Sequence, residues 1–87
     1  MHERALMRDL VARIEATAQA EGATRVTRVT VQLGALSHFT PHHFREHFED
    51  ATRATLAEGA VVETELEGDM TSPRARDVVL MAVEVEV

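Results

Sequence analysis

The sequence predicts an α/β (α+β) fold: a two-layer sandwich of order α-β-α-β-β, with two helices on one face of a three-stranded mixed sheet. Two observations lead to this prediction. Apolar residues repeat at helical spacing in two segments and alternate with polar residues in three others. Alternation indicates that only one face of the sheet is buried, so both helices belong on that face. The predicted helices span 3–21 and 41–56, and the predicted strands span 25–33, 60–67 and 77–87.

The first helix carries one apolar stripe, formed by Leu6, Met7, Leu10, Val11, Ile14 and Ala18. Gly22 follows the stripe and favours the left-handed backbone that ends many helices. The strand after it is expected to point Val29, Val31 and Leu33 toward the helices. Val26 is out of phase with that alternation.

Thr40-Pro41 predicts the start of the second helix, because Thr is a favoured N-cap and Pro a favoured first helical residue. Phe39 and Phe44 stand at the positions of a hydrophobic staple across this cap. The helix is expected to run to about Leu56, and Gly59 closes the segment. The residues that it is expected to bury are Phe44, Phe48, Ala51 and Thr55.

The last two strands each combine an apolar face with glutamates on the other face. Residues expected to face inward are Val62, Thr64, Leu66, Val79, Met81, Val83, Val85 and Val87. Val78 and Leu80 then face outward, either as a patch for a partner or a second copy, or covered by the twist of the sheet or by the loop 68–76. The strands that flank the second helix are expected to be parallel, and the last two antiparallel. Paired glutamates would repel, so the strand order stays open.

Composition limits the function. The 87 residues form one domain, 1–87, with a formal net charge of −6, which argues against nucleic-acid binding. Cysteine is absent, which excludes disulfides and thiolate sites and favours a reducing cytoplasm. No membrane span, signal peptide or catalytic motif is recognisable, so we expect a cytoplasmic protein that is not an enzyme.

The first three residues, Met1-His2-Glu3, form a candidate metal site. The Met1 amine, the His2 amide nitrogen and a His2 ring nitrogen can close two fused chelate rings around one ion. Such nitrogen-rich, roughly planar sets suit Ni(II) or Cu(II). Their donors must lose protons, so affinity should rise with pH. A frayed terminus without a role is the other interpretation of this motif.

Four histidines gather between His38 and His47. His43 and His47 are four residues apart on the second predicted helix, a spacing that can present two imidazoles to one metal ion. They fall on the flank of its apolar stripe, while His42 points away. A solvated helix flank explains the same pattern, and the sequence leaves both interpretations open.

The opening Met1-His2-Glu3, the segments 25–29 and 33–37, the segment 52–60 and the closing 83–86 together resemble the HypA/HybF family of nickel metallochaperones of hydrogenase maturation. The resemblance covers residues 1–67 and 78–87. It implies Ni(II) bound by the Met1 amine, by the His2 backbone nitrogen and imidazole and, less firmly, by Glu3. It also implies delivery to a hydrogenase large-subunit precursor in concert with a partner GTPase.

The chain departs from the family at two places. The family inserts a zinc module with two Cys-x-x-Cys pairs between its last strands, where this chain has the short loop 68–76 without cysteine, so no zinc is expected. Thr40 stands where a family member can offer a carboxylate, for which His38 or His42 are candidate substitutes. The first hypothesis is a nickel-binding accessory protein. The alternative is a non-metal interaction module of the same fold.

Overall fold

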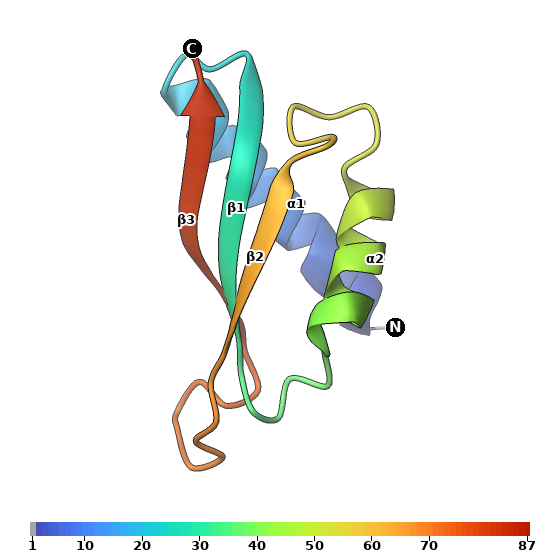
Figure 1. The fold of residues 1–87 in the computed structure, drawn as a ribbon, viewed down its shortest axis with the longest axis vertical. Coiled ribbons are helices and arrows are strands. Elements are labelled where there is room, and N and C mark those ends of the chain that lie inside the picture. The colour runs from blue at the N-terminus through green and yellow to red at the C-terminus, as the bar shows by residue number, and fades with distance from the viewer. Residues whose placement is uncertain (1) are drawn as a thin grey trace.

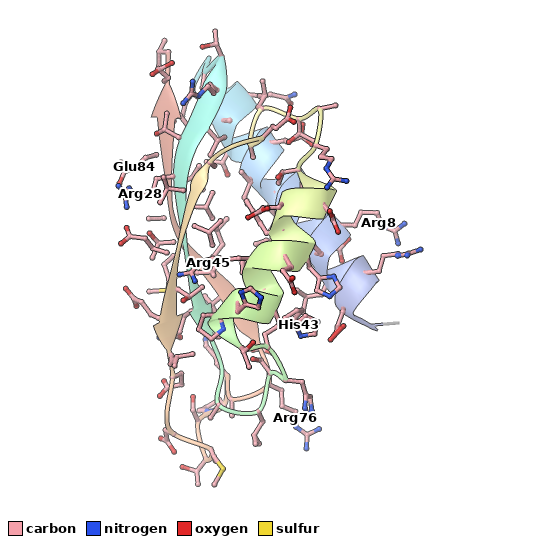
Figure 2. The ribbon with its side chains drawn as sticks, turned by 45° about the vertical axis from the view of Figure 1, so that its right-hand side comes forward. Arg8, Arg28, His43, Arg45, Arg76 and Glu84 are labelled. Carbon is pink, nitrogen blue, oxygen red and sulfur yellow. The ribbon has the colours of Figure 1, made fainter. Side chains whose placement is uncertain are left out.

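The computed structural model describes residues 2–87, with the side chain of His2 left out, and confirms the predicted order of elements (Figure 1). Two helices pack on one face of a three-stranded sheet, and the opposite face is open (Figure 2). None of the described helices is long and apolar enough to cross a membrane. The elements are α1 His2–Ala20, β1 Arg25–Leu33, α2 Pro41–Ala51, β2 Val61–Leu66 and β3 Val78–Glu86.

Strand β1 lies in the centre of the sheet, which has the order β2-β1-β3. It is parallel to β2, as predicted, and antiparallel to β3. The strand order that the sequence left open is thus settled: the two glutamate-bearing strands are kept apart by β1. Between them on the open face, Arg28 lies 2.6 Å from Glu63 and 3.7 Å from Glu84 (Figure 2). Glu63 and Glu84 therefore each face a cation on the central strand, and the repulsion of directly paired glutamates does not arise.

The apolar stripe of α1 lies on the covered face of the sheet as expected, with Met7, Leu10, Ile14 and Ala18 in the core. Gly22 ends this helix with φ 69: its N–H donates to Gln19 and the Ala23 N–H donates to Ala18. These two bonds satisfy carbonyls that the last turn leaves free. Val26, which was out of phase, is fully buried because the register shifts between Val26 and Arg28. The extra residue, Thr27, forms a bulge that restores the inward phase of Val29.

A second bulge makes several predictions for β3 wrong. The β1–β3 register shifts between Thr30 and Val31, where Met81 is the extra residue of β3. Met81, expected inward, is 51% exposed, whereas Val78 and Leu80, expected outward, pack against the core. The proposed apolar patch for a partner or second copy therefore does not exist on the open face. Near the strand ends, Leu66 and Val87 are also exposed instead of buried.

Helix α2 ends at Ala51, five residues short of the predicted Leu56. The Thr52 hydroxyl donates to the Phe48 carbonyl, and Ala54 has φ 63, which a right-handed helix does not allow. Turns carry the chain to Gly59, and the Leu56 carbonyl accepts from the Val26 N–H. This bond ties the segment to the start of β1. Phe44 and Phe48 are buried as expected, while Ala51 and Thr55 are only partly buried.

Candidate metal site

The start of α2 is fixed as the sequence predicted. Thr40 is the N-cap, with an extended backbone (φ −88, ψ 159), and its hydroxyl oxygen accepts from the His43 N–H at 3.1 Å. Phe39 packs edge-on against Phe44, with ring centroids 5.6 Å apart, which is the expected staple. The cap satisfies an N–H group that the helix cannot, and the staple sets the direction in which the chain enters. Together the cap and the staple fix the backbone at His43 and so the position from which its side chain projects.

One turn further along α2, the imidazoles of His43 and His47 meet. Their Nε2 atoms are 2.8 Å apart and their ring centroids 4.6 Å apart. Both residues are partly buried, and Phe39 contacts both rings, with centroid separations of 5.7 and 6.2 Å. The i,i+4 spacing brings the two rings together, and the buried phenylalanine limits how far they can turn away. The pair is therefore a positioned pair of nitrogen donors and not a freely solvated flank.

Glu3 completes this cluster from the other helix. It lies in the first turn of α1, and its Oε2 is 3.9 Å from Nε2 of His47. One ligand atom each from Glu3, His43 and His47 lies within 4.8 Å of the others. The beginning of α1 lies beside α2, with His43 on the side of α2 that faces it (Figures 1 and 2). The structure thus joins two motifs that sequence reasoning treated as separate.

A signal for this juxtaposition was present in the sequence. Glu3 precedes Met7 by four residues and Leu10 by seven, so it shares the face of α1 that the core covers. What the sequence could not supply was the neighbour of that face, because helix docking depends on contacts distant in the chain. The other site predictions fall outside the described part: Met1 and the side chain of His2 are not described.

The remaining histidines do not join the cluster among the described residues. His42 is exposed and its Nε2 lies 3.6 Å from a carboxylate oxygen of Glu46 on the same helix. His38 is exposed, has φ 68 and borders a hollow that Glu3 and Arg76 also line. Thr40, at the position of the family's carboxylate, is occupied as the helix cap. Within residues 3–87, no group of possible metal ligands includes His38, Thr40 or His42.

The backbone at the start of α1 has free donors. The helix begins at His2, and the first four N–H groups of an α-helix have no acceptor within the helix. Binding a metal at an amide nitrogen of the first turn therefore breaks no helical hydrogen bond.

Cationic side chains lie nearby, since Arg4 and Arg8 line a hollow that also contains Glu3, His47 and Asp50. The Arg8 side chain extends away from the sheet (Figure 2).

Residues 1–72 match the family model described as "Hydrogenase/urease nickel incorporation, metallochaperone, hypA". The chain belongs to the HypA family. The hydrogenase maturation factor HypA of Bradyrhizobium sp. (strain ORS 278) is 41% identical over 63 residues, which are 72% of this chain and 56% of that protein. The HypA of Methanosarcina mazei is 40% identical over 63 residues, or 72% of this chain and 42% of that protein. This HypA-family chain thus matches about half the length of these relatives.

A solved structure supports the fold. The solution structure of the Ni metallochaperone HypA from Helicobacter pylori superimposes with a TM-score of 0.80, covering 98% of this chain and 97% of that one, at 17% identity. A second solution structure of a HypA protein gives a TM-score of 0.76, also at 17% identity. At this identity the agreement establishes a shared HypA fold and nothing finer.

The zinc module that the HypA/HybF resemblance implies does not fit this chain. The sequence has no cysteine, so no thiolate zinc site can form. The connection between β2 and β3 is held by hydrogen bonds instead: the Thr71 hydroxyl and N–H donate to Oδ1 of Asp69 at 2.6 and 2.9 Å. These bonds, the one from the hydroxyl first, hold the pKa of Asp69 below its ordinary value. The connection is therefore a short polar turn that contains no cysteine.

Proposed function

We propose that this chain is a nickel-binding accessory protein, which binds Ni(II) through Met1, His2 and Glu3 and releases it to a hydrogenase-maturation partner. The observation that carries the proposal is the family match, because it begins at residue 1 and so includes the Met1-His2-Glu3 motif. The related proteins are named hydrogenase maturation factors, which supports hydrogenase maturation as the setting. In this function the protein carries its metal as cargo and catalyses no reaction.

The chemistry of the motif supports nickel as that cargo. An amine, an amide nitrogen and an imidazole form a nitrogen set that Ni(II) accepts in planar geometry. The net charge of −6 favours the approach of a divalent cation. By family resemblance, the partners are a nickel-accessory GTPase and a hydrogenase large-subunit precursor. The alternative, a non-metal interaction module, loses the Val78/Leu80 patch, because both residues pack against the core, and is left with the edge of the sheet.

A nickel titration of His2→Ala tests the proposal. Ni(II) affinity should fall more than tenfold, which corresponds to more than about 1.4 kcal/mol, because the substitution removes the imidazole that closes one of the two chelate rings. The thermal midpoint should stay unchanged, since the buried stripe of α1 begins only at Leu6. Calorimetric titration near neutral pH, with absorbance for a planar Ni(II) band, measures both affinity and geometry.

His42→Ala is the matched control, because it removes an exposed imidazole elsewhere on the surface. It should leave nickel affinity unchanged. Acetylation of the Met1 amine should act like His2→Ala, since it converts the chelating amine into an amide. If His2→Ala protein with a verified Met1 start gives the planar band at the parental affinity, the terminal chelate is not the nickel site.

A further inference from the structure

We infer that Glu3, His43 and His47 form a second metal site, built from side chains alone, that binds a divalent first-row transition-metal ion. The site shares Glu3 with the proposed terminal nickel site but goes beyond it, because it needs neither the free amine of Met1 nor the imidazole of His2. Its three ligand atoms lie within 4.8 Å of one another and come from two helices that pack together.

The donor types select the class of ion. Two imidazole nitrogens and one carboxylate oxygen suit borderline ions such as Ni(II), Cu(II), Co(II) and Zn(II), whereas Mg(II) and Ca(II) prefer oxygen ligands alone. One carboxylate charge partly neutralises a divalent ion, and three protein ligands leave further positions for water or a transferring ligand. The side chains of His47 and Glu3 are each 40% exposed, so an ion can reach them from solvent.

The distance between the two imidazole nitrogens limits the coordination geometries in which both can bind one metal ion. At metal–nitrogen distances of about 2.0–2.1 Å, two nitrogens at a right angle are about 2.8–3.0 Å apart, and two at a tetrahedral angle about 3.3–3.4 Å. The Nε2 atoms of His43 and His47 are 2.8 Å apart. The pair as it stands fits the right-angled coordination of planar or six-coordinate Ni(II) and Cu(II) better than that of tetrahedral Zn(II). Glu3, at 3.9 Å from His47, needs only a turn of its half-exposed side chain to join.

The rings are also held in place before any ion binds. Phe39 is 8% exposed and packs against both of them, and the Thr40 cap fixes the backbone N–H of His43. At 2.8 Å the two nitrogens share one proton, with one ring donating and the other accepting. An ion bound to both Nε2 atoms needs both rings in the neutral form that carries its hydrogen on Nδ1, so the donating ring moves its hydrogen from Nε2 to Nδ1 and the helix need not rearrange.

The test uses full-length protein in which the terminal chelate has been removed, by His2→Ala and one glycine added before Met1. Ni(II) is titrated into this protein by calorimetry, and amide broadening in NMR spectra locates the paramagnetic ion. We expect one ion per chain, with broadening centred on the start of α2. Adding His43→Ala or His47→Ala should lower affinity at least tenfold, and Glu3→Gln should lower it by a smaller factor while keeping the shape of the side chain.

His42→Ala in the same background is the matched control and should bind as well as its parent, because its ring is outside the cluster. Circular dichroism of each variant shows whether it is folded; for one that is not, His43→Gln or His47→Gln takes its place. No binding in the blocked protein, or equal losses from His42→Ala and His43→Ala, would overturn the second site. These results are independent of the terminal chelate, whose own failure appears as an unchanged planar band when only His2 is replaced.

Discussion

At the scale of single residues, Ala54 holds a backbone conformation that a side chain disfavours. Its φ of 63 lies in the left-handed region, where the Cβ of an L-residue crowds the following carbonyl. Ala54→Gly should therefore raise the free energy of unfolding by about 0.5–1 kcal/mol, as the removed strain exceeds the greater chain entropy of glycine. Urea unfolding followed by circular dichroism measures the change.

The same substitution in a helix should act in the opposite direction. Ala16 is exposed in the interior of α1, where Ala16→Gly should lower stability by about 1 kcal/mol. Both variants replace an alanine by glycine, and they differ in the backbone conformation at that alanine, which is left-handed at Ala54 and helical at Ala16. Destabilisation by both would mean that Ala54 is not strained in solution.

The candidate site shows what single residues reveal in the sequence and what they do not. The spacing of His43 and His47 predicted a shared face, and the chemistry of Met1-His2-Glu3 predicted a chelate. Both inferences are local: one rests on helical periodicity, the other on adjacent backbone atoms. That Glu3 lies 3.9 Å from His47 is a tertiary fact, because it depends on how α1 and α2 dock. Nothing within either segment specifies that distance.

At the scale of elements, the start of α2 depends on one hydroxyl. Thr40→Ala removes the acceptor of the His43 N–H and should lower the free energy of unfolding by about 1 kcal/mol. Thr40→Ser keeps the acceptor and should restore most of the loss. Urea midpoints of the three proteins measure the effect. If Ser and Ala variants were equally unstable, the threonine methyl group and not the cap would be responsible.

The predicted faces are correct in β1 from Val29 onward and in β3 at Val83 and Val85, and they are wrong in β3 before the bulge at Met81. In β1, Val29, Val31 and Leu33 face the core as predicted. In β3, one extra residue at Met81 reverses the phase, so Val78 and Leu80 turn inward. A bulge adds a residue without a signature in an all-apolar run such as 78–83. The position of β1 at the centre was equally hidden, because strand order is set by packing between distant segments.

At the scale of the whole molecule, the link between β2 and β3 is anchored on the turn that follows β1. The Gly34 N–H donates to the Asp77 carbonyl and the Leu36 N–H donates to the Ala75 carbonyl, at 2.9 and 2.6 Å. Ala75 is only 4% exposed. Packing and backbone hydrogen bonds hold this link, so the integrity of the domain should depend on how closely the two backbones approach.

Gly34→Ala tests that dependence. A Cβ at Gly34 would meet the carbonyl oxygens of Ala75 and Arg74, which belong to the backbone and cannot swing aside. We expect a loss of about 1–3 kcal/mol, as for overpacked interiors, together with faster amide hydrogen exchange across residues 74–77. Gly68→Ala is the matched control in the same connection: nothing lies within 4 Å of its new Cβ and its φ is not in the left-handed region. It should be neutral or slightly stabilising because alanine restricts the unfolded chain. Equal stability of Gly34→Ala and Gly68→Ala would show that the link is not held against the turn, and that the domain is maintained by its helix-covered sheet alone.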